Sequence, residues 1–177
     1  RLWITAEPHP QFPIGLLQMS IKLTNEAPVG MRAGLRNSYA WVTQDMMDAV
    51  PRYEWRQLLF TMCYLHSIVQ ERRKFGPIGW NIQYEFNASD LGACVQFLQN
   101  HITEMDMKKL NSPTWPTVTY MISSIQYGGR ITDGFDELLM DTYAGKYFNQ
   151  NALTKGIELF PGYRVPASTD ATDFPPD

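Results

Sequence analysis

Apolar positions repeat along most of the chain at the spacing of an α-helix. The clearest case lies between residues 54 and 74, where Leu58, Met62, Leu65 and Val69 recur every three or four residues. The same periodicity predicts further helices over residues 29–49, 87–107, 115–125 and 132–148.

Polar residues at the starts of two of these helices predict where they begin. Asn87 or Ser89 can cap one helix, and Thr132 or Asp133 can cap another. For the helix over residues 115–125, the expected inward positions are Met121, Ile122 and Ile125. For the helix that ends near residue 148, they are Phe135, Leu138, Leu139, Thr142 and Tyr143.

Extended structure is expected only at the two ends of the chain. Residues 2–5 and 21–24 read as short strands, with one or two helical turns between Pro13 and Ser20. After residue 149 the periodicity fades, which predicts an extended tail or linker. The fold class is therefore mainly α, a helical bundle preceded by the end of an α/β layer.

A loop between two predicted helices carries an unusual number of ring side chains. We call residues 75–87 the aromatic loop; its rings are Phe75, Trp80, Tyr84 and Phe86. Connecting loops are normally polar because they run over the protein surface. Rings at this density predict a buried structural joint that closes the helical core.

Length, composition and charge narrow the class of protein. The chain has 177 residues, of which 44% are hydrophobic, enough for one sizeable core or two small ones. A net charge of −3 argues against a nucleic-acid-binding surface, which needs clustered Lys and Arg. No apolar run approaches the roughly 20 residues of a membrane span, and no signal-peptide pattern is present. The abrupt start at Arg1 predicts a fragment of a longer chain.

The sequence predicts no catalytic, cofactor-binding or metal site. Cys63 and Cys94 lie in apolar helical patterns, which favours buried thiols in a reducing compartment, and no metal-ligand spacing occurs. His66 lies on an apolar stripe, where a core histidine is favoured over a ligand or proton shuttle. The loop from Gly76 to Gly79 lacks the Gly-Lys-Ser/Thr ending of a phosphate-binding loop.

Charged residues flank the aromatic loop and a later Gly-Gly turn. Arg72 at the end of its helix suits the negative pole of the helix dipole, and Arg130 can pair with a carboxylate or a helix-end carbonyl. An anion at the Gly-Gly turn would be repelled by Asp133 and Asp136. We hypothesise that the two segments form one joint, or bind a neighbouring module, through Arg72, Arg73, Phe75, Trp80, Asn81, Tyr84, Tyr127, Gly128, Gly129, Arg130, Asp133 and Asp136.

Three blocks of sequence resemble the dynein heavy chain family. The aromatic loop with its preceding residues reads Glu-Arg-Arg-Lys-Phe-Gly-Pro-Ile-Gly-Trp-Asn-Ile-Gln-Tyr-Glu-Phe-Asn, from Glu71 to Asn87. The second block, Tyr127 to Asp133, reads Tyr-Gly-Gly-Arg-Ile-Thr-Asp, and the third runs over residues 12–39. The matches cover nearly the whole chain up to about residue 148, and they resemble the end of the dynein motor ring.

The resemblance implies the sixth AAA+ module of an ATP-driven, minus-end-directed microtubule motor. Residues 1–28 would end the α/β large subdomain, residues 29–150 would form the helical lid, and residues 151–177 would lead into a C-terminal domain. In this family the sixth module closes the ring and transmits conformational change without binding nucleotide, while other modules bind ATP and Mg²⁺. The implied partners are neighbouring modules and the C-terminal domain, and, through the parent chain, microtubules, intermediate chains and light chains.

The residues in these blocks resemble axonemal outer-arm heavy chains more than cytoplasmic ones. This resemblance implies that the protein is located in the axoneme of a cilium or flagellum; a cytoplasmic location is the alternative. Three positions depart from the family pattern. Gln83 replaces a usual proline, Gly134 a common aspartate and Leu138 a usual arginine. The helical turn at residues 16–19 also lacks the arginine that active AAA+ modules direct at a neighbour's nucleotide, so an inactive interface is expected.

Two readings from other classes remain open. The chain could be an autonomous helical adaptor that binds a partner through the aromatic loop. It could also be a small enzyme with a site around His66 and the Arg72–Arg73 pair. An adaptor should fold cooperatively alone, and an enzyme should lose activity on His66→Ala while it stays folded.

Overall fold

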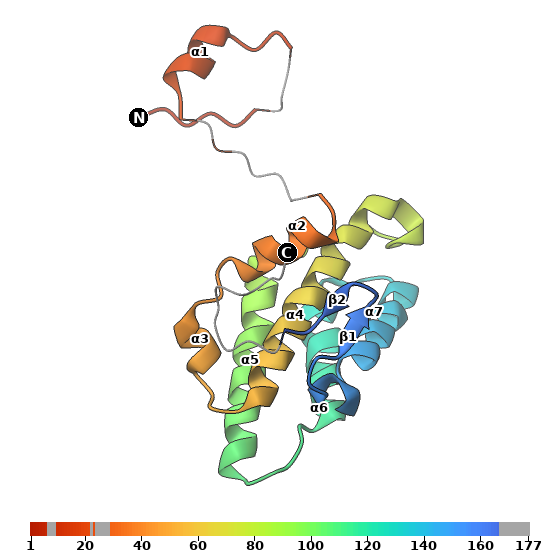
Figure 1. The fold of residues 1–177 in the computed structure, drawn as a ribbon. Helices are drawn as coiled ribbons and strands as arrows, with labels where there is room; N and C mark the ends of the chain where they lie inside the picture. Colours follow the sequence, from red (N-terminus) through yellow and green to blue (C-terminus); the bar gives the residue numbers. More distant parts are fainter. Residues whose placement is uncertain (7–9, 22, 24–28, 167–177) are drawn as a thin grey trace.

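A computed structural model describes residues 1–6, 10–21, 23 and 29–166, and Figure 1 shows its fold. In chain order the elements are the helices α1 (Ile14–Met19), α2 (Met31–Tyr39), α3 (Gln44–Asp48) and α4 (Tyr53–Arg72), the 3₁₀ segment η1 (Arg73–Ile78), α5 (Ala88–Met107), α6 (Trp115–Tyr120), the π-helix η2 (Met121–Tyr127), the 3₁₀ turn η3 (Gly128–Arg130), α7 (Gly134–Tyr147), the 3₁₀ segment η4 (Gln150–Leu153), and the strands β1 (Glu158–Phe160) and β2 (Tyr163–Arg164). The prediction of a mainly α fold is confirmed.

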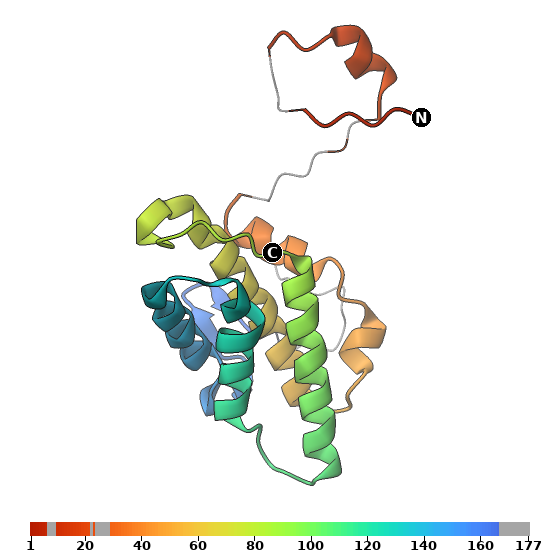
Figure 2. The same ribbon diagram turned by 180° about the vertical axis from the view of Figure 1, so that it is seen from behind.

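Helix α4 is the centre of the helical body. It packs against α2, α5 and α7, and the ribbon seen from both sides shows α4 lying between α5 and α7 (Figures 1 and 2). A helix that is apolar around most of its circumference belongs inside a core. Accordingly, Trp55, Leu58, Leu59, Met62 and Leu65 are all fully buried.

Side-chain caps fix the starts of α5 and α7, as predicted. Asn87 Oδ1 accepts hydrogen bonds from the backbone N–H groups of Ser89 (3.0 Å) and Asp90 (3.3 Å), and Asp90 Oδ2 accepts from the Asn87 N–H (2.9 Å). This reciprocal pair is a capping box. At α7, Asp133 Oδ1 accepts from the N–H groups of Phe135 (3.0 Å) and Asp136 (3.1 Å).

Two predictions for the first part of the chain are wrong. The single helix expected over residues 29–49 is divided into α2 and α3, because Thr43 starts α3 by accepting a hydrogen bond from the Met46 N–H (3.3 Å). Residues 2–5 form no strand, since a strand needs a partner for its backbone groups and the described residues offer none there. Residues 22 and 24 of the second expected strand lie outside the described residues; the predicted turns over residues 13–20 are present as α1.

Helix α7 turns a different face inward from the one predicted. Phe135 and Leu138 are 77% and 64% exposed, whereas Asp136 is only 3% exposed. Of the other expected inner residues, Thr142 is exposed and Leu139 and Tyr143 are half-buried. The helix is oriented by the Asp136 carboxylate, which accepts two backbone hydrogen bonds from the aromatic loop.

Helix α6 continues into the π-helix η2, which changes the face expected of it. Ile122 is buried as predicted, but Ile125 is 46% exposed and Tyr127 is fully buried. A π turn holds more residues than an α turn, so the side chains after it are rotated relative to an ordinary helix.

The segment after residue 149 is more ordered than the extended tail that was expected. The strands β1 and β2 form an antiparallel hairpin, and Val165 beyond them is 1% exposed. The ring of Tyr163 lies 5.4 Å from that of Tyr64 in α4, so the hairpin packs on the helical body. The described part of the chain contains no helix with the length and apolar character needed to cross a bilayer.

Candidate functional site

Three of the four rings in the aromatic loop are buried in one cluster. Trp80, Tyr84 and Phe86 are 1%, 6% and 7% exposed, with their ring centroids 5.8–5.9 Å apart. The Trp80 Nε1–H donates to the Val69 carbonyl of α4 (3.0 Å). Phe75 differs from the expectation: it lies in η1 and is 62% exposed. The loop is therefore a packed joint with one ring left on the surface.

Arg72 ties the aromatic loop to α4 and α7. Its Nε and Nη2 donate to the Gly79 carbonyl (3.1 and 2.7 Å), and Nη2 also donates to the Ile78 carbonyl (3.0 Å). Its Nη1 donates to the Tyr143 hydroxyl (2.7 Å). The guanidinium carbon lies 5.7 Å from the ring centre of Trp80 and 5.1 Å from that of Tyr143, within cation–π range.

The start of α7 holds the other side of the loop. Asp136 accepts from the backbone N–H groups of Asn81 (3.0 Å) and Ile82 (3.2 Å). The Asn81 side-chain amide donates to Asp133 (3.0 Å), and this bond, with those from the α7 backbone, lowers the pKa of the Asp133 carboxyl. The Tyr84 hydroxyl accepts from the Asp133 N–H (3.2 Å). The two segments proposed from sequence to form one joint thus lie in direct contact.

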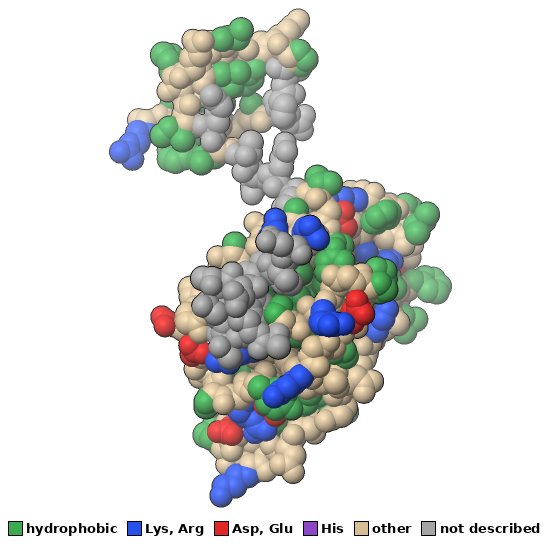
Figure 3. All heavy atoms as spheres, in the orientation of Figure 1, with side chains coloured by type: hydrophobic (Ala, Val, Ile, Leu, Met, Phe, Trp, Pro, Cys, Tyr) green, Lys and Arg blue, Asp and Glu red, His purple; other side chains and the backbone are tan. Residues whose placement is uncertain are grey.

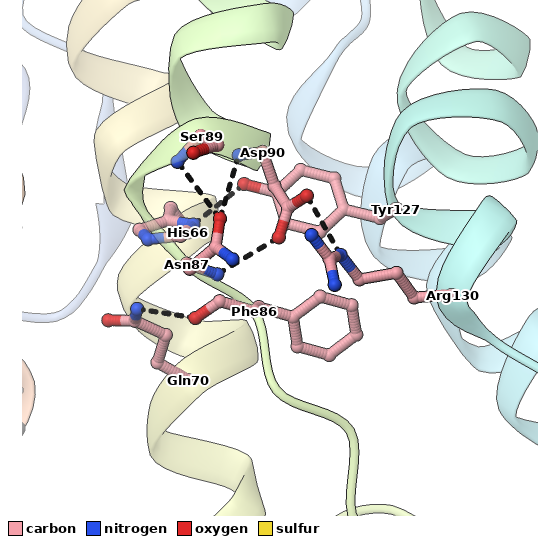
Figure 4. Close-up of polar contacts among 8 residues, drawn as sticks. All are labelled: His66, Gln70, Phe86, Asn87, Ser89, Asp90, Tyr127 and Arg130. Atoms are coloured by element: carbon pink, nitrogen blue, oxygen red, sulfur yellow. Dashed lines mark hydrogen bonds and ion pairs between the residues drawn. The ribbon is translucent and has the colours of Figure 1, made fainter.

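Arg130 makes a separate contact. Its Nε donates to Asp90 Oδ1 at the start of α5 (2.9 Å), with the side chain of Asp90 9% exposed and that of Arg130 43% exposed (Figure 4). Arg130 therefore pairs with a carboxylate, but with one on a different helix from Asp133 and Asp136. Arg73 reaches Glu85 at 3.4 Å on the surface, where an ion pair adds little stability.

Sequence reasoning missed two residues of this region. Tyr143 was assigned to the core of α7, yet its hydroxyl and ring both contact Arg72. It lies seven residues after Asp136, two helical turns along the same face, so the spacing could have paired them. Asp90 accepts a hydrogen bond from the Asn87 N–H at the start of α5, and it also binds Arg130, for which no local signal exists.

A buried polar pair lies beneath the loop. His66 Nδ1 is 2.8 Å from the Tyr127 hydroxyl, and the two residues are 2% and 0% exposed (Figure 4). The prediction of a core histidine is confirmed. Cys63 and Cys94 are buried free thiols, and burial raises the pKa of Cys94 to about 12. Within the described ranges, no group of three or more His, Cys, Asp and Glu side chains is placed to hold a metal ion.

The buried histidine predicts a loss of stability in acid. Burial lowers the pKa of His66 to about 4, partly opposed by the charge of Asp90, while an unfolded histidine titrates near 6.5. Between these two pH values the unfolded chain binds more protons than the folded chain. The free energy of unfolding of the protein should therefore fall as the pH drops from about 6.5 to about 4, by up to about 3 kcal/mol. Urea unfolding at several pH values measures this slope.

His66→Gln removes the titrating group and should remove most of that slope. His101→Gln is the matched control: burial also lowers the pKa of His101, but this side chain is only half-buried, so its removal should take away a much smaller part of the slope. If both variants kept the full slope, carboxylates rather than His66 would account for it.

Comparison with known proteins identifies the family. Residues 55–175 match the model of the dynein heavy chain AAA lid domain. The chain is 69% identical to the dynein gamma chain of the flagellar outer arm of Chlamydomonas reinhardtii, over 98% of this chain, and 54% identical to dynein axonemal heavy chain 5 of Mus musculus, over 94%. It is 51% identical to dynein axonemal heavy chain 8 of Homo sapiens, and it spans about 4% of the length of these relatives. The chain belongs to the dynein heavy chain family and carries its AAA lid domain.

Proposed function

We propose that this chain is a non-catalytic segment of the motor ring, in the sixth AAA+ module, which helps close the ring and transmits conformational change without binding nucleotide. Residues 1–28 would end the large subdomain, residues 29–150 would form the lid, and residues 151–177 would begin the link to a C-terminal domain.

The observation that carries this proposal is an exposed apolar edge beside a firmly bonded joint. Five large apolar side chains are between 45% and 88% exposed there; we call Phe75, Ile78, Ile82, Phe135 and Leu138 the apolar edge. Hydrophobic side chains gather at the side of the body where η1 and the start of α7 lie (Figure 3). Apolar patches on folded proteins mark contact surfaces.

The residues of the apolar edge are held by the joint beneath them. The Ile82 N–H donates to Asp136 (3.2 Å), and the Ile78 carbonyl accepts from Arg72 (3.0 Å). Phe135 and Leu138 are one turn apart on α7. A movement imposed on this edge would therefore reach α4 and α7 together, which supports a role in transmitting motion between modules.

At the level of the whole protein, we propose an ATP-driven, minus-end-directed microtubule motor of the axoneme. The relatives are named as flagellar outer-arm and axonemal dyneins, which supports this location and this class of motor. ATP and Mg²⁺ would bind in other modules, with no cofactor in this segment. Intermediate chains, light chains and microtubules would be partners of the parent chain.

The test places two carboxylates on the apolar edge of the full-length heavy chain. Phe135→Asp with Leu138→Asp should lower the microtubule gliding velocity, because two carboxylates cannot be buried in an apolar contact without a large desolvation cost. Release of the motor from microtubules by ATP, measured by co-sedimentation, reports whether the nucleotide-binding module still works and should persist.

Met107→Asp is the matched control, since Met107 is 73% exposed at the end of α5. Its gliding velocity should equal that of the unaltered motor, and thermal melting of both variants checks folding. Normal gliding by the folded Phe135→Asp, Leu138→Asp motor would rule out a role of this edge in transmission. A full-length chain that does not bind microtubules in co-sedimentation would contradict the proposal that it is a microtubule motor.

A further inference from the structure

The helix from Trp115 to Arg130 is wound in three different ways along its length. It starts as α-helix in α6, widens to π-helix in η2, and tightens to a 3₁₀ turn in η3. Seven residues of π-helix are unusual, since π turns are rare and occur mostly as single turns, frequently at functional sites.

The π-helix decides which side chains face the core. Val118, Ile122 and Tyr127 are all 0% exposed, at spacings of four and then five residues. In a continuous α-helix the inward face would pass through residues 118, 122 and 125. Ile125 would then be buried, and Tyr127, two residues further on, would point away from the core. Ile125 is instead 46% exposed, an apolar side chain left on the surface by the π-helix.

Two side-chain bonds and one glycine fit the observed winding. The Tyr127 hydroxyl bonds to His66 of α4 (2.8 Å), and Arg130 bonds to Asp90 of α5 (2.9 Å); both side chains point to these partners in Figure 4. Gly128 packs so closely on the preceding turn that a Cβ there would lie 2.3 Å from the Ser123 carbonyl oxygen. Only glycine fits this position in the observed register.

We propose that residues 121–130 form a register switch with two packed states. In the observed state the π-helix keeps Tyr127 on His66 and leaves Ile125 in solvent. In the second state the segment rewinds as α-helix, Ile125 turns into the core, and Tyr127 turns out. The shift is passed on through Gly128 and Gly129, where glycine tolerates the changed backbone conformation.

The switch connects two parts of the lid. A shift of one residue rotates the following side chains by about 100°, which withdraws Arg130 from Asp90. The next residues lead to Asp133, which caps α7 and binds Asn81 of the aromatic loop. The winding of the π-helix thus determines the position of the start of α7, and of the aromatic loop bound to it, relative to α4 and α5. This inference rests on the packing of the lid alone and stands independently of the proposed function.

Hydroxyl-radical footprinting of the full-length heavy chain, read by mass spectrometry, tests the switch through Ile125 and Tyr127. Gly128→Ala penalises the observed register, because its Cβ would meet the Ser123 carbonyl. Oxidation of Tyr127 should rise about fivefold or more, the lower end of the usual penalty for overpacking a filled site, while oxidation of Ile125 falls. Gly129→Ala is the matched control: a Cβ there has no atom within 4 Å, and both rates should stay unchanged.

His66→Leu is the second variant, because it removes the partner of Tyr127 and leaves both reporters in place. It should give the same opposite changes at Tyr127 and Ile125. Local unfolding would raise both oxidation rates together, and a rigid helix would change neither. Either of those results, in both variants, would overturn the switch.

Discussion

Replacing Gly79 with alanine is expected to lower the free energy of unfolding by about 4 kcal/mol or more, the range reached only by severe core defects. The added Cβ would lie 1.8 Å from the carbonyl oxygen of Arg72 and 2.8 Å from its carbonyl carbon. Both are backbone atoms at the end of α4, so no side-chain rotation relieves the clash. The loop would have to lift off the helix, and the bonds from Arg72 to the Gly79 carbonyl would break.

Urea unfolding measures this loss, and a second glycine provides the control. Gly92 lies inside α5, and a Cβ there would meet nothing within 4 Å. Gly92→Ala should raise the free energy of unfolding by about 0.5–1 kcal/mol, because alanine loses less backbone entropy in a helix. Equal stability of the two variants would mean that the loop accommodates a side chain at Gly79 and that the joint is not rigid.

Trp80→Ala should lower the free energy of unfolding by about 3–5 kcal/mol, the usual cost of removing a buried large ring. The indole is 1% exposed, contacts the rings of Tyr84 and Phe86, and donates to the Val69 carbonyl. Its removal leaves a cavity and an unpaired carbonyl at the end of α4. Thermal and urea unfolding both report the change.

Phe75→Ala, in the adjacent 3₁₀ segment, is the comparison for Trp80. Phe75 is 62% exposed, so its removal should change the free energy of unfolding by no more than about 0.5 kcal/mol. Comparing the two losses of unfolding free energy shows whether burial of the ring, and not merely its presence in the loop, stabilises the protein. A Trp80→Ala chain as stable as the Phe75→Ala chain would show that the ring cluster contributes little to the core.

The features that could be predicted from sequence are those set by nearby residues. The caps at Asn87 and Asp133 act on N–H groups two or three residues away, so local composition was sufficient. The inward face of α7 could not be found in this way. Asp136 points inward because its partners, Asn81 and Ile82, lie more than fifty residues earlier in the chain.

The π-helix also could not be predicted from the spacing of apolar residues. Ile122 and Ile125 fit an ordinary α-helix, and nothing in their spacing indicates an extra residue per turn. The wider winding depends on tertiary contacts, above all the bond from Tyr127 to His66. Gly128 offered a partial signal, because a glycine before a helix end can mark a close backbone approach as well as a turn.

For the candidate site, the aromatic pattern was the most informative signal. It identified Trp80 and Tyr84 as parts of a buried joint, and the charged residues around it placed Asp136 in the same region. The pattern could not show that Phe75 lies outside, because ring content alone does not give the direction of a side chain. The partner of Arg130 was equally undetermined, since several carboxylates could have reached it.

The way in which Arg72 is bound has a consequence for behaviour in salt. Its contacts described above are two backbone carbonyls, one hydroxyl and the faces of two rings, none of which carries a net charge. Mobile ions screen interactions between exposed charges and have much less effect on buried dipoles and ring faces. The Arg130–Asp90 ion pair is partly exposed and is therefore subject to this screening. A rise in ionic strength should thus loosen the attachment of η3 to α5, while the contacts by which Arg72 joins α4, the aromatic loop and α7 keep their strength.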